Sequence, residues 1–234
     1  MKSITIAILL TLVFVAAAQA DRRHLVWTYE YQTIPQGSTE LEFYQTFKNR
    51  PQDLWEYRFE LEHGLTDRWD ISLYEIFAQA DGEPLTWDAF QLRTRYRLGE
   101  SGQGLFDPLL YLEYNRPTQS KNPNALETKL ILERELAGLN LALNPVYEVK
   151  FAPGTEHEAG LDAGLFWEPR PAFSIGVESV TRLEFEDEET ETQSYFGPTF
   201  SYASGKWWAS AGVAARLTEN GDQTRVRLLL GIAL

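Results

Sequence analysis

One hairpin pattern, repeated along the chain, restricts most strongly what this sequence can fold into. Its clearest copy is Leu54–Phe77, in which apolar and charged residues alternate on both sides of a turn predicted at Gly64–Asp67. Successive side chains of a strand point to opposite faces, so each half has one apolar and one charged face. In the turn, Gly64 would supply unusual backbone angles and Asp67 would bond its own backbone. Each run has about ten residues, the length of a tilted strand that crosses a bilayer.

Strands of this kind follow one another to the end of the chain. Their connections alternate between short turns and longer, more polar loops, as at the two ends of an outer-membrane barrel. The longer set is predicted at 49–53, 79–85, 116–124, 152–157, 187–192 and 218–223. The predicted strands are 39–48, the two halves of 54–77, 86–98, 106–115, 126–136, 139–151, 158–167, 173–184, 195–202, 207–217 and 225–234.

The predicted fold class is all-β, a closed antiparallel up-and-down transmembrane β-barrel of about 12 strands over residues 39–234, with 14 strands left open. A soluble β-sandwich also alternates apolar and polar residues. Nearly uniform strand lengths, sided loops and aromatic residues near the strand ends favour the barrel. The last strand alternates up to Leu234 and resembles the C-terminal strand read by the barrel-insertion machinery of Gram-negative bacteria, although that signal usually ends in Phe.

The first 20 residues have the pattern of a secretory signal peptide. Lys2 precedes an apolar stretch at Ile4–Ala17, and Ala18-Gln19-Ala20 is a small-residue cleavage site before Asp21. No later apolar run approaches the length of a spanning helix, so entry into a membrane requires a closed barrel. We therefore predict export to the outer membrane of a Gram-negative bacterium, with outer-membrane lipid, lipopolysaccharide and the barrel-insertion machinery as partners.

Charge and the segment before the first strand limit the function further. The formal net charge of −13 argues against nucleic acid as a partner, because binding it requires an excess of Lys and Arg. Residues 21–38 form an N-terminal arm in which Leu25, Trp27, Tyr29 and Tyr31 alternate, so part of it is expected to be extended. Four interpretations of the arm are open: a plug in the lumen, an extra strand, a periplasmic segment, or a disordered leader.

Short segments along the chain resemble a known group of proteins. They are Thr33-Ile34-Pro35-Gln36-Gly37, Glu40-Leu41-Glu42, Leu61-Glu62-His63-Gly64-Leu65-Thr66-Asp67-Arg68, Phe196-Gly197-Pro198 and Lys206-Trp207-Trp208-Ala209. Together they resemble a family of small Gram-negative outer-membrane barrels of unassigned function, over most of the chain after residue 20. The resemblance implies a location and a fold, and it carries over no catalytic residue.

If the apolar faces meet lipid, the charged faces line a lumen that is wet, heavily ion-paired, or both. Acids outnumber bases on these faces, which predicts a narrow and mildly cation-favouring channel for small hydrophilic solutes. The three arginines at 93, 95 and 97 would set a transverse field, or else belong to a salt-bridge lattice that fills the barrel. The predicted pore-lining residues are Arg93, Arg95, Arg97, Glu56, Glu60, Glu62, Asp70, Glu133 and Arg182.

Two rival classes of function have weaker support in the sequence. A filled barrel with a structural or surface role needs no channel. An outer-membrane lipid hydrolase needs a Ser-His pair, and the nearest candidate to His157 is Ser174, near the far end of the next strand. The acidic run 186–191 is predicted to be a solvated outer loop rather than a Ca²⁺ or Mg²⁺ site. We therefore assign no catalytic residue, metal ligand or cofactor.

Overall fold

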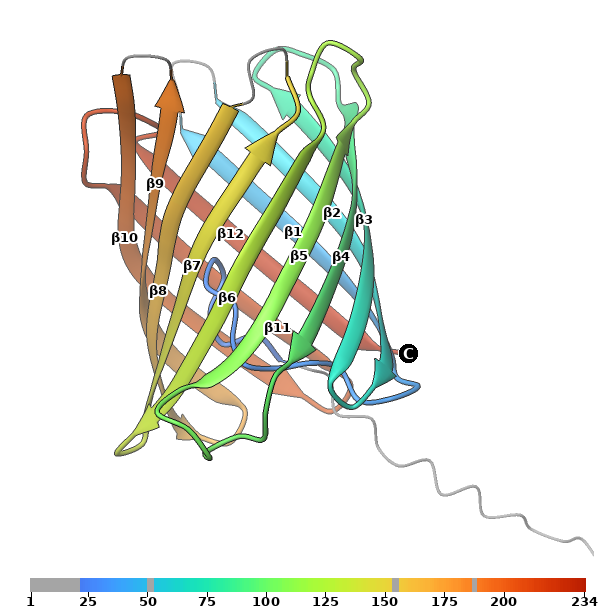
Figure 1. Ribbon diagram of the computed structural model, residues 1–234, viewed down its shortest axis with the longest axis vertical. Coiled ribbons are helices and arrows are strands. Elements are labelled where there is room, and N and C mark those ends of the chain that lie inside the picture. The colour runs from blue at the N-terminus through green and yellow to red at the C-terminus, as the bar shows by residue number, and fades with distance from the viewer. Residues whose placement is uncertain (1–21, 50–52, 153–155, 187–188) are drawn as a thin grey trace, which may run out of the picture.

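The computed structural model describes residues 22–49, 53–152, 156–186 and 189–234, and the predicted signal peptide lies outside these residues. In the described chain, twelve antiparallel strands form a closed barrel in which each strand pairs with its sequence neighbours and β1 pairs with β12 (Figure 1). No described helix is long and apolar enough to cross a membrane. The strands are β1 Thr39–Asn49, β2 Leu54–Thr66, β3 Trp69–Ala80, β4 Thr86–Arg97, β5 Asp107–Pro117, β6 Ala125–Leu136, β7 Leu139–Lys150, β8 Glu156–Arg170, β9 Phe173–Glu186, β10 Glu189–Ser204, β11 Trp207–Arg216 and β12 Thr224–Ala233.

The barrel wall has its apolar residues outside and its charged residues inside. Leu61 is 46% exposed on the outer surface, whereas Glu60, the residue before it, is fully buried. The same alternation places Ile71 outside and Asp70 inside on β3. This arrangement is the reverse of a soluble protein, and it follows from the strand period of two when the solvent around the barrel is lipid.

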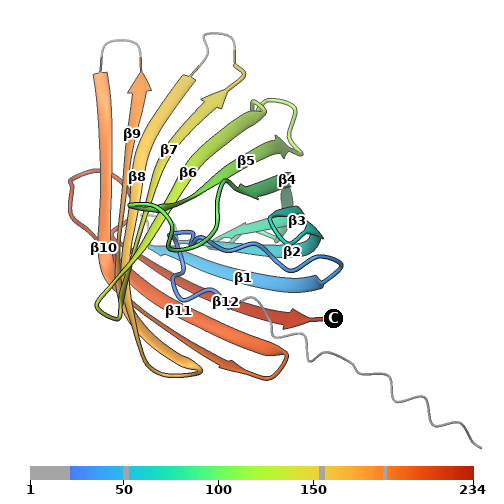
Figure 2. The same cartoon turned by 60° about the horizontal axis from the view of Figure 1, so that its bottom comes forward.

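The two ends of the barrel differ (Figures 1 and 2). At one end, which we call the turn end, four of the five connections are two residues long. One of them, Ala137-Gly138, has positive φ at both residues (53° and 84°), as in a type I′ hairpin turn. The opposite end, which we call the loop end, carries the more polar connections, including residues 118–124 and 217–223.

The predicted barrel and its twelve strands are confirmed, with three local corrections. The tenth strand begins at Glu189, six residues before the predicted start. The acidic run is therefore not one loop, because Glu186 ends β9 and Glu191 pairs with Glu184. A strand that projects past the membrane has water on both faces, so it lacks the alternation by which strands are recognised.

The third correction concerns the predicted turn at Gly64–Asp67. The strand β2 continues to Thr66, and Gly64 does not have a positive φ. A Cβ at Gly64 would lie 2.2 Å from the carbonyl oxygen of Pro35, so this glycine is required for close approach of the arm. The Asp67 carboxylate accepts a hydrogen bond from the backbone N–H of Gln36 at 3.0 Å, again in the arm.

Candidate functional site

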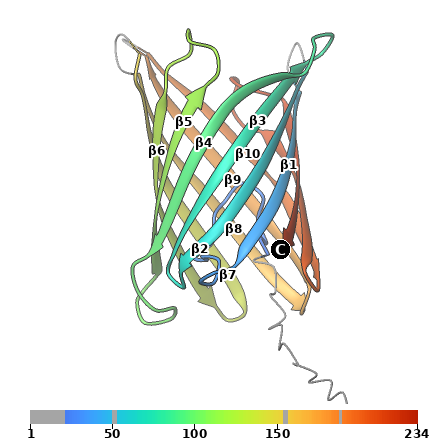
Figure 3. The same cartoon turned by 90° about the vertical axis from the view of Figure 1, so that its right-hand side faces the viewer.

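Arm residues 22–34 lie inside the barrel, in the half next to the turn end, and Pro35, Gln36 and Gly37 are exposed at that end (Figure 3). They enter beside β8, where Arg22 forms an ion pair with Glu168 at 2.7 Å. They return to β1 beside β2, where the N–H of Gly37 donates to the carbonyl of Gly64 at 2.8 Å. Residues 22–37 form no strand. Leu25 and Val26 are fully buried, so the arm fills its part of the lumen.

A single carboxylate holds the tip of the arm. Glu178 on β9 accepts hydrogen bonds from three consecutive backbone N–H groups, those of Val26 (2.7 Å), Trp27 (2.8 Å) and Thr28 (2.7 Å). Hydrogen bonds to an ionised acceptor are roughly twice as strong as neutral ones. Glu178 is 1% exposed, so water does not compete for these bonds. The carboxylate thus supplies the acceptors that an irregular backbone tip lacks.

The returning limb of the arm is held by side chains of three other strands. Asn144 on β7 accepts from the N–H of Tyr29 at 2.6 Å and donates to its carbonyl at 2.9 Å. The N–H of Tyr31 donates to Glu133 on β6 at 2.6 Å. The N–H of Ile34 donates to Asp70 on β3 at 3.3 Å. Because the partners are side chains of the wall, the limb is bound without joining the sheet.

One bond network lies within the arm itself. Glu30 accepts hydrogen bonds from the backbone N–H groups of His24 (2.8 Å) and Leu25 (3.0 Å), and its other oxygen lies 2.5 Å from Nδ1 of His24. Burial raises the pKa of Glu30, but His24 and the Leu25 N–H favour the carboxylate and bring the pKa below its ordinary value. These contacts close residues 24–30 into a compact loop.

The Tyr29 ring is where the arm meets the cations of the lumen. The guanidinium of Arg23 lies 4.2 Å from the ring centroid, Lys129 Nζ lies 5.0 Å from it and the Arg93 guanidinium 5.5 Å. Burial raises the pKa of Tyr29, but these three cations outweigh burial and lower it. Cations over an aromatic face attract the ring electrostatically.

Two glycines of the wall leave room for the arm. A Cβ at Gly164 on β8 would lie 2.3 Å from Cδ1 of Leu25. A Cβ at Gly212 on β11 would lie 2.6 Å from Cγ2 of Val26 and 2.9 Å from Cζ3 of Trp27. Neither glycine has a positive φ, so the backbone itself does not require glycine there. The wall is therefore shaped to the occupied lumen.

Beside the arm, five of the predicted pore-lining residues form one buried ion-pair network. Arg93 Nη2 lies 2.5 Å from Glu60 and 2.7 Å from Glu62. Arg95 forms ion pairs with Glu62 and with Asp70, the latter at 2.7 Å. The partners lie on the neighbouring strands β2, β3 and β4, so in this state the charges form a lattice along the wall.

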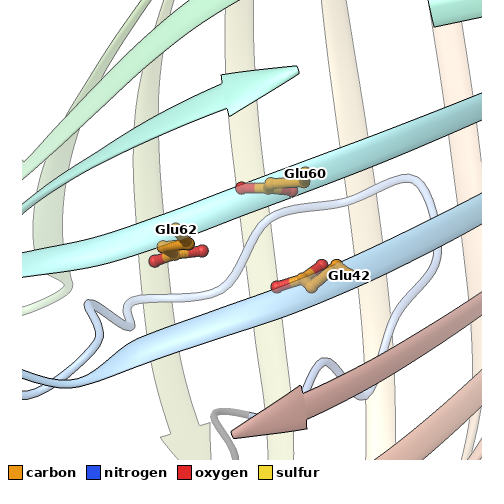
Figure 4. Close-up of side chains that lie close together, drawn as sticks. All are labelled: Glu42, Glu60 and Glu62. Atoms are coloured by element: carbon orange, nitrogen blue, oxygen red, sulfur yellow. The ribbon is translucent and has the colours of Figure 1, made fainter. Parts of the chain in front are cut away.

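Three carboxylates of this region lie close together, with oxygens of Glu42, Glu60 and Glu62 within 4.8 Å of one another (Figure 4). The Tyr44 hydroxyl lies 2.7 Å from oxygens of both Glu42 and Glu60. The arginines of the lattice form ion pairs with Glu60 and Glu62. All three carboxylates of the cluster thus already contact protein groups, either the Tyr44 hydroxyl or the arginines of the lattice.

At the loop end, the lumen is charged but open to water. Glu56 pairs with Lys48 at 3.2 Å and with Arg58 at 2.7 Å. Arg182 pairs with Glu158 at 3.1 Å and also with Asp162. The Arg58 side chain is 27% exposed and that of Arg182 19%, against 1% for Arg93. The charged vestibule at the loop end therefore leads to a lumen that the arm occupies.

The structure thus separates the nine predicted residues. Glu56 and Arg182 lie in the vestibule, whereas Glu60, Glu62, Asp70, Arg93 and Arg95 form the lattice. Glu133 binds the arm, and the Arg97 guanidinium lies 5.6 Å from the ring centroid of Tyr31. Their role in conduction stays a prediction. The sequence pattern does not distinguish Glu178 and Asn144, because each is an inward-facing polar residue like many others in the barrel.

The candidate Ser-His pair is not assembled. The Ser174 hydroxyl is buried at the turn end and lies 2.7 Å from the hydroxyl of Ser201. His157 lies near the loop end, where its Nδ1 is 2.7 Å from the Tyr147 hydroxyl. The two residues stand near opposite ends of β8 and β9, so no proton can pass directly between them.

Comparisons with known proteins agree with this architecture. Residues 119–227 match the profile of a family of unknown function (DUF6662), as the resemblance to barrels of unassigned function implied. No protein with a curated description matches the sequence. The structure is similar to that of the COG4313 outer membrane channel from Pseudomonas putida F1, with a TM-score of 0.64 and 14% identity over 90% of this chain and 100% of the other.

Two porins also have this fold. The KdgM porin, in complex with disordered oligogalacturonate, gives a TM-score of 0.60 at 14% identity, covering 83% of this chain and 99% of the porin. The NanC porin gives a TM-score of 0.62 at 11% identity, covering 83% of this chain and all of the porin. At such low identity the likeness concerns the fold. The chain folds as a twelve-stranded antiparallel barrel of the kind found in outer-membrane channels and porins.

Proposed function

We propose that this protein is a narrow channel for small hydrophilic solutes in the outer membrane of a Gram-negative bacterium, and that the structure is its closed state. The observation that carries the proposal is the contrast along the lumen. Charged side chains at the loop end reach water, whereas those beside the arm are sealed from it. A water-exposed, charged vestibule is the entrance that a channel requires.

The lumen favours cations and neutral solutes. Acids outnumber bases among its inward-facing residues, and the whole chain carries a formal net charge of −13. The KdgM porin was solved with oligogalacturonate, which is an anionic sugar polymer. An acidic lumen repels such a ligand, so we infer a different class of solute here. The separation of His157 from Ser174 supports a transport role rather than lipid hydrolysis.

Export through a cleaved signal peptide at residues 1–20 and assembly by the barrel-insertion machinery belong to the same proposal. The alternating last strand supports it, because Leu230 and Ile232 face outward up to the C-terminus. Lipopolysaccharide and outer-membrane lipid would then surround the exposed apolar wall.

The test is single-channel conductance of the refolded mature protein in a planar bilayer, with and without residues 21–38. We expect rare openings in the whole chain and sustained openings in the shortened chain, because the arm fills the lumen. The barrel is first verified as folded from its heat-modifiable mobility on gels. Silence in both folded forms would overturn the channel.

A filled barrel with a structural or surface role is the second candidate. The observation that favours it is the extent of the bonding between wall and arm, since Glu178, Asn144 and Glu133 accept hydrogen bonds from five backbone N–H groups of the arm at 2.6–2.8 Å. The same experiment separates the two candidates, because a filled barrel stays silent in its full-length form under all voltages.

A further inference from the structure

A groove on the outer surface of the barrel, near the loop end, is separate from the lumen. Its volume is about 760 Å³, and its wall includes Glu75, Phe90, Arg116 and the connection 118–124. Glu75 pairs in register with Phe90, and Phe90 with Arg116, so the three side chains lie in one row across β3, β4 and β5. The row faces away from the lumen, because it alternates with buried inward residues such as Tyr74 and Gln91.

The groove is apolar on one side and polar on the other. Trp87 and Phe151 contribute aromatic rings that are 52% and 56% exposed. Arg116 is exposed and stands one residue before β5 ends at Pro117. Thr118, Ser120 and Asn122 add hydroxyl and amide groups from the connection. Aromatic rings near a strand end mark the level at which hydrocarbon meets the polar headgroups.

Arg116 is an unusual residue for this position. It is an exposed cation on the lipid-facing wall of an acidic chain, and it forms no ion pair with any residue in the described ranges. A guanidinium at the membrane surface is stabilised by an anion, and its planar fork matches the oxygens of a phosphate. Glu75 lies two strands away, roughly 10 Å at ordinary strand spacing, so it leaves the arginine free to meet an anion.

We propose that this groove binds lipopolysaccharide from the outer leaflet through the phosphorylated glucosamine headgroup of its lipid A. Arg116 forms an ion pair with the phosphate, and the side chains of the connection 118–124 hydrogen-bond to sugar hydroxyls. An acyl chain packs on Phe90, Trp87 and Phe151. The groove would select this lipid because lipid A combines a phosphate, neighbouring sugar hydroxyls and acyl chains in one molecule. The inference rests on the outer-membrane location in the proposed function, and it is independent of whether the barrel conducts.

The test measures bound lipid A on the refolded mature protein in detergent by native mass spectrometry, over a titration. We expect Arg116→Ala to weaken lipid A binding about tenfold, as loss of a charge-assisted hydrogen bond predicts. Arg116→Lys keeps the charge and is expected to recover part of the affinity. The matched control is Arg134→Ala, which removes an arginine near the turn end whose Nη1 donates to the carbonyl of Gly104 at 2.7 Å.

Lipid A without its phosphates and phosphatidylethanolamine are the comparison ligands. Weak binding of both by the wild-type protein supports the proposal. Equal binding of dephosphorylated lipid A, equal binding of phosphatidylethanolamine, or unchanged lipid A affinity in Arg116→Ala overturns it. An equal loss in Arg134→Ala also overturns it, because the effect would then belong to arginines of the wall in general. If the barrel does not conduct but still binds lipid A through Arg116, the proposed channel function is wrong and the proposed lipid site stands.

Discussion

At the scale of single residues, Glu178 holds three backbone N–H groups of the arm. Its carboxylate accepts from the N–H groups of Val26, Trp27 and Thr28 at 2.7–2.8 Å in a buried site. A neutral amide in its place offers one acceptor oxygen and turns a donor toward the remaining N–H groups, which leaves them unsatisfied.

We therefore expect Glu178→Gln to loosen the arm. Loss of charge-assisted bonds worth about 1.5–3 kcal/mol each in proteins predicts at least about a tenfold rise in open probability. Planar-bilayer recording measures this. Glu184→Gln is the matched control, because Glu184 lies on the same strand and contacts Gln193 at 3.4 Å rather than the arm. An equal effect of both substitutions would show that lumen charge, and not the arm contact, sets the openings.

The pH dependence of the arm follows from Glu30. Its pKa in the folded state lies below the ordinary value of 4.5, so the carboxylate stabilises the arm fully above that value. The stabilisation is lost as the pH falls through the lower, folded-state pKa. Hydrogen exchange of residues 22–34, corrected for the intrinsic rate, should show constant protection down to about pH 4.5 and a loss below it. Glu30→Gln should lower the protection at neutral pH. A loss between pH 5 and 7 would show that the response does not come from Glu30.

At the scale of elements, the strands β8 and β11 carry glycines where the arm presses on them. Leu25 fits against Gly164, and Val26 and Trp27 fit against Gly212. An inward-facing side chain at these positions competes directly with the arm for space.

Gly212→Leu should expel the arm and leave the barrel intact, since the clashing atoms belong to side chains of the arm and not to the wall. The expected result is sustained conductance close to that of the chain without residues 21–38. Ala78→Leu is the control, because Ala78 also faces inward on β3 but lies near the loop end. Unchanged rare openings in Gly212→Leu would show that the arm does not control the pore.

Gly197 has a different role within β10. A Cβ there would lie 1.7 Å from the backbone carbonyl of Val213 on β11, so one of the two strands must shift. Gly197→Ala should lower the free energy of unfolding by about 1–3 kcal/mol, the usual cost of overpacking. The urea midpoint of refolding measures it. Gly99→Ala, at a position where no atom lies within 4 Å of the added Cβ, should be neutral.

At the scale of the whole molecule, selectivity depends on all charges that reach the pore once the arm has left. The Arg93 and Arg95 lattice then lines the open lumen together with Glu60, Glu62 and Asp70. In the chain without residues 21–38, Arg93→Ala with Arg95→Ala should shift the reversal potential across a salt gradient toward cations. Arg134→Ala removes an arginine outside the lumen and should leave it unchanged. An unchanged potential in the double variant would place the selective constriction elsewhere.

Much of the barrel was predictable because its rules are local. The strand period of two is a property of the pleated backbone, so Glu60 and Leu61 could be assigned to opposite faces without any knowledge of their neighbours. Local reasoning failed at the start of β10, where a strand with water on both faces lacks the alternating pattern. It also failed at Gly64, where glycine is required by the close approach of Pro35 and not by a turn.

The ordered sequence of alternating runs was sufficient for the architecture, since closure is the way to pair every backbone group of such strands in lipid. The sequence pattern could not determine whether the lumen is open or filled. Val26 and Glu178 are 152 positions apart, and Tyr29 and Asn144 are 115 apart. Such contacts exist only after β1 has met β12 and the enclosed space has a definite width and lining. The inward-facing charges and the aromatic arm can therefore be recognised in the sequence. That the arm binds these charges and fills the lumen is decided only by the three-dimensional packing.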